Sequence, residues 1–191
     1  PGVPAKESPA RQRALETVDT QRDELVRLSR DIWGWAETAL RETRSAAALA
    51  DYAERQGFRV ERGVAEMPTA FIATFGAGRP IIGIVGEYDA LPGISQKAQP
   101  AQEPLQPGGG GHGCGHNLFG PASLGAAVAI KDRIAAGDLQ GTIRYYGTPA
   151  EEAVGGKIYM ARDGLFRDVD AVLVWHPSDK TRADTTSSQA L

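Results

Sequence analysis

Several features that would point to common protein classes are scarce in this sequence. It contains one cysteine, so no disulfide can form within the chain and the usual sign of an oxidising compartment is missing. A cytoplasmic location is therefore the default expectation. Apolar runs such as Ile81–Val85 and Ala171–Trp175 are short, far below the roughly 20 residues that cross a bilayer. We expect a soluble protein with no membrane partner.

An excess of one charge is also missing. The chain carries 21 basic and 24 acidic residues, for a net charge of −3, and no basic stripe is visible. Attraction to the polyanionic backbone of nucleic acids therefore has no source, and we expect no nucleic-acid partner. The G-x-S-x-G sequence of serine hydrolases does not occur either, which excludes a nucleophile elbow of that kind.

The length and hydrophobic content of the chain suffice for one domain. With 191 residues, 41% of them hydrophobic, the chain can bury one sizeable core but hardly two. Residues 1–9 are rich in proline and lack the basic start and apolar stretch of a signal peptide. We expect them to be a flexible segment, followed from residue 10 by a single α/β domain.

Helical periodicity is clearest near the beginning of the chain. Apolar residues such as Leu25, Leu28 and Ile32 are spaced by three or four positions, which predicts one long helix over about 10–36. A further helix is expected over 45–56, ending at a glycine. A third is expected from Asn117, as its N-cap, to about residue 136, and a short one near 157–163.

Between the helices the pattern favours strands, because short runs rich in β-branched and aromatic residues are bounded by glycine and proline. The stretch 88–111 is too rich in proline and glycine for regular structure and is long for a connection. Strands alternating with helices predict an α/β three-layer sandwich around a mixed, mostly parallel sheet. The expected strands are 58–64, 70–75, 81–85, 142–146 and 171–175.

Chemically active side chains follow these strands. Glu87 and Asp89 come after one strand, Glu151 and Glu152 after the next, and His176 after the last. In open α/β sheets, functional groups gather beyond the carboxyl ends of the strands. We therefore expect these side chains to meet at one edge of the sheet.

Two further candidates precede the helix that starts near residue 117. Cys114 and His116 alternate along the chain, so a sulfur and an imidazole nitrogen can face one ion, and the glycines beside them allow close approach. Thiolate, imidazole and carboxylate are ligands of zinc and of related divalent metals. Of two adjacent glutamates, one is expected to bind metal and the other to act as a general base. The role of His112, in the same loop, stays open between a structural and a supporting one.

Two other motifs compete for the same residues. Gly108, Gly110 and Gly113 formally match G-x-G-x-x-G, but they follow coil rather than a strand, which argues against a dinucleotide site. A cysteine hydrolase stays possible, with Cys114 as nucleophile and a histidine as base, although the pair of glutamates would then have no role.

Three strings carry a family resemblance: GEYDALP at 86–92, GHGCGHN at 111–117 and PAEE at 149–152. They resemble the M20 family of metallopeptidases, in its aminoacylase-like amidohydrolase branch, and are most similar to the aminobenzoyl-glutamate utilisation hydrolases. MPTAF at 67–71 and WHP at 175–177 fit the same branch.

The resemblance implies that Cys114, His116, Glu152 and His176 bind metal, that Glu151 is the general base, and that Asp89 orients the site. It implies two divalent ions, Mn²⁺ or Zn²⁺, and hydrolysis of the amide bond of an N-acyl or N-aroyl amino acid. Glu87 stands where other branches carry a metal-binding histidine, and its role stays open.

The chain departs from the family by lacking a further metal-binding histidine and an inserted lid or dimerisation domain. The resemblance thus implies a zinc-peptidase-like catalytic domain that is incomplete at the C-terminus, with its first part at 10–180 and the start of a link to the lid at 181–191. We expect the isolated chain to be weakly active or inactive, and the complete protein to form a homodimer or hetero-oligomer through the lid. The alternative is a non-catalytic metal-binding subunit, or a degenerate relative, that completes a partner's site.

Overall fold

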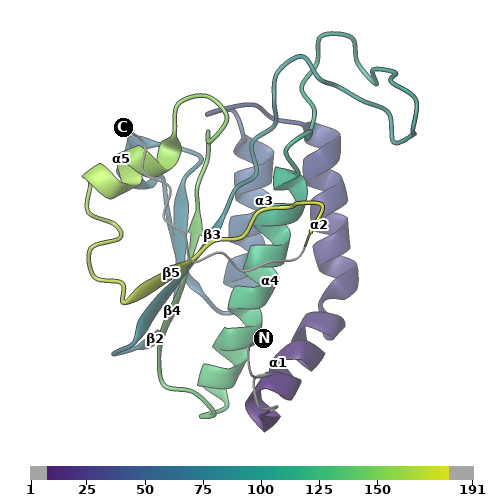
Figure 1. Ribbon diagram of the computed structural model, residues 1–191. Helices are drawn as coiled ribbons and strands as arrows, with labels where there is room; N and C mark the ends of the chain where they lie inside the picture. Colours follow the sequence, from purple (N-terminus) through teal and green to yellow (C-terminus); the bar gives the residue numbers. More distant parts are fainter. Residues whose placement is uncertain (1–7, 181–191) are drawn as a thin grey trace.

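Five strands form one mixed sheet in the computed structural model, which describes residues 8–180 (Figure 1). Their order across the sheet is β1-β2-β4-β3-β5. β3 runs parallel to β4 and to β5, whereas β2 is antiparallel to β1 and to β4. The strands are β1 (Arg59–Arg62), β2 (Phe71–Ala77), β3 (Ile81–Gly86), β4 (Gly141–Gly147) and β5 (Ala171–Leu173).

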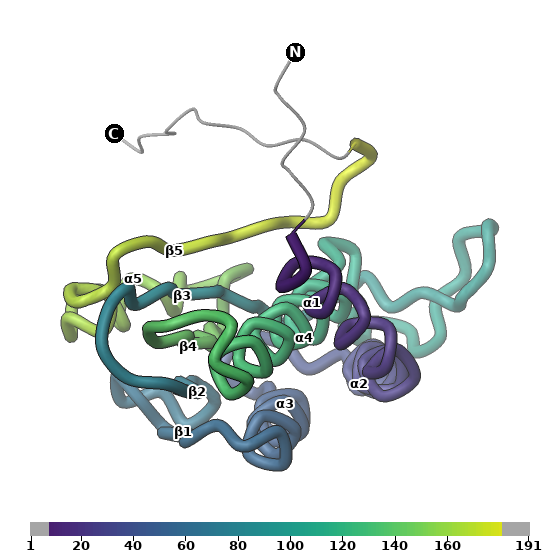
Figure 2. The backbone as a smooth tube through the Cα atoms, turned by 90° about the horizontal axis from the view of Figure 1, so that it is seen from below, coloured from purple at the N-terminus to yellow at the C-terminus, as the bar shows by residue number. Residues whose placement is uncertain are grey.

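Helices cover both faces of this sheet, which confirms the predicted three-layer α/β architecture (Figure 2). On one face, α3 and α4 lie directly on the sheet, and α1 and α2 pack against α4. On the other face lies the short α5. The helices are α1 (Pro9–Thr20), α2 (Arg22–Trp35), α3 (Thr43–Arg55), α4 (His116–Ala135) and α5 (Gly156–Arg162), with a 3₁₀ turn at Val64–Glu66.

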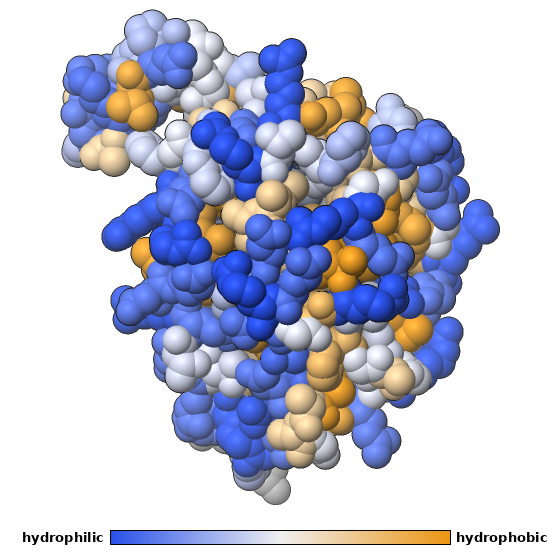
Figure 3. All heavy atoms as spheres, turned by 180° about the vertical axis from the view of Figure 1, so that it is seen from behind, coloured by the Kyte–Doolittle hydropathy of each residue, from blue (hydrophilic) through white to orange (hydrophobic). Residues whose placement is uncertain are grey.

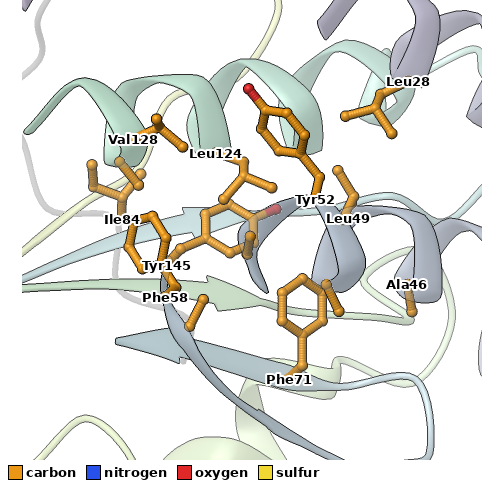
Figure 4. Close-up of a cluster of buried hydrophobic side chains, with 14 of the residues drawn as sticks. Leu28, Ala46, Leu49, Tyr52, Phe58, Phe71, Ile84, Leu124, Val128 and Tyr145 are labelled. Atoms are coloured by element: carbon orange, nitrogen blue, oxygen red, sulfur yellow. The ribbon is translucent and has the colours of Figure 1, made fainter. Parts of the chain in front are cut away.

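The alternation of side chains along the central strands divides the core into two parts. Ile84 and Tyr145 point towards α3 and α4 and belong to the larger cluster, shown in Figure 4. Their neighbours Val85 and Tyr146 point to the opposite face and pack in the smaller cluster with Met160 of α5. Burying one such side chain contributes about 1.5–3 kcal/mol. The two clusters therefore fix the sheet from both sides and hold its carboxyl edge in place.

The prediction of one helix over 10–36 was wrong, because the chain bends between α1 and α2. α1 ends at Thr20, and Gln21 links the two helices. The hydroxyls of Thr17 and Thr20 and the amide of Gln21 donate hydrogen bonds to main-chain carbonyls of the preceding turn. Such side-chain bonds compete with the helical pattern. The oxygen of the Gln21 amide accepts a bond of 2.5 Å from Tyr52 of α3, which ties the bend to the core.

The predicted N-cap at Asn117 was also wrong. α4 begins at His116, and the capping position is Gly115, whose φ of 82° is left-handed. Asn117 lies in the first turn, where its side-chain amide donates to the hydroxyl of Ser29 in α2 at 3.2 Å. Tertiary contact thus uses the group that would otherwise cap the helix. The glycine allows the chain to turn sharply between Cys114 and His116.

β5 is shorter than the predicted strand 171–175 and pairs only with β3 among the strands of residues 8–180. After Leu173 the chain leaves the sheet and crosses the start of α4. Leu173 and Val174 are 59% and 60% exposed, so this edge presents apolar side chains and unpaired main-chain groups to solvent.

β2 and β3 are consecutive in the chain but are not neighbours in the sheet, because β4 lies between them. Their connection therefore passes over the end of β4 and does not form a hairpin. The stretch 88–111 has no regular structure beyond isolated bridges, as expected, and it projects from the molecule at the upper left of Figure 3, on a largely hydrophilic face. No helix within residues 8–180 is long and apolar enough to cross a membrane.

The predicted link at 181–191 and most of the N-terminal segment 1–9 lie outside the described residues. Ser8 and Pro9, at the end of that segment, already belong to α1 and its cap. The Ser8 hydroxyl accepts a hydrogen bond of 3.2 Å from the main-chain N–H of Arg11 and so caps the helix.

Candidate metal centre

The side chains that follow β3, β4 and β5 meet at the start of α4, as the sequence predicted. The sharpest test of that prediction is the distance between Cys114 and His176, which are 62 positions apart in the chain. Cys114 Sγ lies 3.2 Å from His176 Nε2. Together with His116, these two residues offer ligand atoms that all lie within 4.8 Å of one another. A sulfur and two imidazoles at this spacing are a donor set typical of zinc.

His116 is the buried centre of the cluster, with no exposed surface. Its Nδ1 lies 3.0 Å from Asp89 Oδ1 and 3.1 Å from the Asp89 carbonyl oxygen, so Nδ1 carries the proton and donates it to Asp89. Its Nε2 faces Glu87 Oε2 at 2.8 Å, an ion-pair contact that lacks the geometry of a hydrogen bond. When a cation displaces the proton from Nε2, the lone pair of that nitrogen can bind the metal while Nδ1 donates to the Asp89 carboxylate, the arrangement of a metal-binding histidine.

Both glutamates that follow β4 lie close to His116. Glu152 Oε1 is buried without a hydrogen bond, 3.9 Å from His116 Nδ1. Glu151 is exposed, and its carboxylate forms a second compact group with Glu87 and His116, again within 4.8 Å. The structure therefore places both residues at the centre. Glu151 is within reach of an ion shared with Glu87 and His116, and its carboxylate can serve there as a ligand or as a base.

The charges of the cluster favour a bound cation. Burial raises the pKa of the Cys114 thiol to about 12, and the carboxylates of Glu152, Glu151 and Glu87 act in the same direction. Burial alone would lower the pKa of His116, but Asp89 and Glu87 raise it to about 10. Cations in this place would replace protons and offset the crowded negative charge. The sulfur, nitrogen and oxygen donors fit divalent ions, and His116 Nε2 and Glu152 Oε1 are buried without a hydrogen bond.

His112 lies outside the cluster, so the structural alternative left open for it is favoured. Its Nε2 is 3.1 Å from the main-chain oxygen of Ile32, which ties the glycine-rich loop to α2. Burial lowers the pKa of His112 to about 4, which keeps the ring neutral near pH 7.

Lys157 was not identified from the sequence. Its ammonium group, at the start of α5, forms an ion pair with Glu87 Oε1 inside the cluster. Burial opposes ionisation of Glu87, but His116 and Lys157 outweigh it and lower the pKa of that carboxyl. No spacing or motif links a lysine to a glutamate 70 positions earlier, so only the fold reveals the pair.

The segment that carries His176 is held by the first turns of α4. Trp175 Nε1 donates a hydrogen bond of 2.8 Å to Ser123 Oγ, and the indole packs edge-on against Phe119 at 5.4 Å between ring centres. Pro177 lies against Gly115, where an added Cβ would come within 2.9 Å of the proline ring. The absence of a side chain at Gly115 therefore sets how closely the two ligand segments approach.

Replacing Gly115 with Ala should weaken metal binding about 10–100-fold, as changes around metal ligands commonly do. The new methyl would meet Pro177 and strain a left-handed residue, which moves His176 away from Cys114. Competition with a chelator measures the affinity. The control is Gly137→Ala beyond the other end of α4, which has a similar φ of 78° but open space around it. Equal affinities in both variants would contradict the role of this close approach.

Comparison with known proteins agrees with this geometry. The model of the family described as "Peptidase family M20/M25/M40" matches residues 83–187. One subunit of the p-aminobenzoyl-glutamate hydrolase of Escherichia coli is 47% identical over 85% of this chain and 34% of that protein. The human Xaa-Arg dipeptidase is 35% identical over 90% of this chain and 39% of that protein.

A solved structure of an M20 peptidase has a similar fold. A Bacillus subtilis protein described as a dinuclear metal binding peptidase from the M20 family superposes with a TM-score of 0.69 at 26% identity, over 81% of this chain and 42% of that one. The chain spans between 34% and 39% of the length of the two curated relatives. Because the family model covers more than half of the sequence, the chain belongs to peptidase family M20/M25/M40.

Proposed function

We propose that the complete protein hydrolyses the amide bond of an N-acyl or N-aroyl amino acid, with two divalent cations held at the centre described above. The observation that carries the proposal is the meeting of Cys114, His116 and His176 within 4.8 Å, beside a pair of glutamates. The name of the Escherichia coli relative supports p-aminobenzoyl-glutamate as the substrate to test first. The human dipeptidase makes dipeptides the second class to test.

In this mechanism Cys114, His116, Glu152 and His176 would hold the cations. When bound, the cations supply Lewis-acid polarisation of the amide carbonyl and make water a better nucleophile. Glu151 accepts the proton of the attacking water. Glu151 then delivers that proton to the amide nitrogen as the carbon–nitrogen bond breaks, so that a neutral amine leaves. Asp89 fixes the tautomer and orientation of His116 through the bond to Nδ1.

The donor atoms of the centre suit more than one metal. The thiolate favours zinc, whereas carboxylate and imidazole suit manganese equally well. We propose Zn²⁺ or Mn²⁺, a cytoplasmic location, and assembly of the complete protein as a homodimer or with a different polypeptide. The name of the Escherichia coli relative, which describes it as one subunit of a hydrolase, supports the second form of assembly. A subunit that only completes a partner's site is the alternative to this proposal.

Elemental analysis of the complete protein, together with hydrolysis assays on p-aminobenzoyl-glutamate and other N-acyl amino acids, tests the proposal. We expect up to two bound ions and activity that a chelator removes and the metal restores. Metal without activity towards any substrate would support the non-catalytic alternative. Activity that survives metal removal but is lost on alkylation of Cys114 would favour the cysteine hydrolase instead. The thiol's raised pKa argues against that mechanism, since a nucleophilic cysteine needs a lowered one.

A further inference from the structure

Glu42 is a buried carboxylate that the proposed mechanism does not use. It immediately precedes α3 and has no exposed surface. One of its oxygens accepts a hydrogen bond of 3.0 Å from the Thr69 hydroxyl, and the other accepts one of 3.0 Å from the main-chain N–H of Ala150. Within residues 8–180 no Lys, Arg or His forms an ion pair with it. Burying a carboxylate without a cation costs free energy, so its presence calls for a reason.

Capping of α3 does not supply that reason. The Glu42 side chain makes no capping bond to the helix that follows it. That task falls to Glu37, whose carboxylate accepts bonds of 2.8 Å from both the N–H and the hydroxyl of Ser45. The two oxygens of Glu42 are instead committed to Thr69 and to a loop 108 positions away in the chain.

That loop carries the proposed general base. Ala150 directly precedes Glu151 and has a φ of 59°, a left-handed conformation that is strained for a non-glycine residue. On the other side of Glu151, the N–H of Glu152 donates to Asp89 Oδ2 at 2.9 Å. Two buried carboxylates, Glu42 and Asp89, therefore hold the main-chain amides on either side of Glu151. Glu42 holds the N–H of the strained Ala150, while the Ala150 carbonyl accepts bonds from the N–H groups of Val154 and Gly155.

We propose that Glu42 is a positioning residue for Glu151, which it fixes through the N–H of Ala150. The inference rests on the proposed function only for its effect on turnover. The contact itself can be tested without any assay of activity. Asp89 serves the same loop from the opposite side, but Asp89 also holds His116, whereas Glu42 touches no proposed ligand side chain. Glu42 can thus be changed with less direct disturbance of the metal.

The test compares Glu42→Leu with Glu42→Gln in the complete protein. Leucine fills much of the same space but accepts no hydrogen bond, so kcat should fall about 10–100-fold with little change in KM or in bound metal. Glutamine can still accept from the Ala150 N–H and donate to the Thr69 hydroxyl, so it should restore most of the turnover. Glu37→Ala is the matched control, since it removes an equally engaged carboxylate and should lower Tm without lowering kcat.

Hydrogen exchange gives a readout independent of catalysis. In Glu42→Leu, amides of residues 148–152 should exchange faster than in the parent protein, whether metal is bound or removed. Unchanged exchange there would overturn the proposal. So would a loss of kcat that merely follows loss of metal, or an equal loss in Glu37→Ala. If Glu42→Leu does not fold, Thr69→Val removes one of the two anchors of Glu42, and unchanged exchange in that variant overturns the proposal as well. Faster exchange in a protein that hydrolyses no amide would support the positioning contact and refute the proposed function.

Discussion

Replacing Glu151 with Gln should lower the kcat of amide hydrolysis by the complete protein about 10²–10⁴-fold, the range lost with a general base, and leave its metal content unchanged. Glutamine keeps the size and polarity of the side chain but cannot take a proton from water. Because Glu151 is exposed while His116 and Glu152 lie deeper, the substitution should not disturb the packing of the centre. Turnover of p-aminobenzoyl-glutamate and elemental analysis of the same sample give both quantities.

Glu152→Gln is the matched comparison, one position along the chain. One oxygen of its carboxylate, Oε1, is buried without a hydrogen bond, so replacement of Glu152 should lower bound metal as well as turnover. Unchanged turnover in Glu151→Gln would remove Glu151 from the mechanism. If Glu151→Gln instead lost metal in proportion to activity, Glu151 would be a ligand, a role that its proximity to Glu87 and His116 permits.

Replacing Cys114 with Ala should weaken binding of the metal by more than about 100-fold, the upper range seen when a residue outside the ligand shell is changed. The substitution removes the one sulfur of the cluster and leaves His116 and His176 without a third donor in their group. Alanine is close to cysteine in size, so the fold should be retained. Chelator competition on the complete protein, with Zn²⁺ and Mn²⁺ in turn, measures the loss.

His112→Gln is the control for this substitution, because His112 lies two positions away in the same loop but bonds to the Ile32 carbonyl of α2. Its metal affinity should stay near that of the parent protein. A larger loss for zinc than for manganese in Cys114→Ala would fit the preference of thiolate for zinc. Undiminished affinity for both metals would exclude Cys114 as a ligand.

The meeting of the candidate side chains was more predictable from the sequence than the details of the helices. Its residues follow strands with clear β-rich patterns, and the geometry of an open α/β sheet then brings Asp89, Glu152 and His176 to one edge. No comparable rule governs the bend at Gln21 or the start of α4. Both depend on side chains that bond to the main chain or to another helix, as Asn117 does with Ser29.

Glu42 and Lys157 show where sequence reasoning stops. A glutamate just before a helix and a lysine near the start of another are common solvent-exposed residues, and neither belongs to one of the strings that carry the resemblance. Their partners, Ala150 and Glu87, are 108 and 70 positions away. The pairing of β3 with β4 brings Glu87 near Lys157, and the packing of α3 against β4 brings Glu42 near Ala150. The residues that support a site are therefore harder to predict than the residues that form it.

The proposed ligand residues lie in separate segments, after β4, after β5 and at the start of α4, so no single segment of an unfolded chain can assemble them. On the proposed assignment, cation binding is then linked to the folding equilibrium of the whole sheet. A free ion concentration 100 times its dissociation constant would add about 2.7 kcal/mol to the native state. When metal is scarce in the cell, the folded fraction of the protein would fall and proteolysis would lower its abundance. This loss of abundance would come before any change in the turnover rate of the molecules that stay folded.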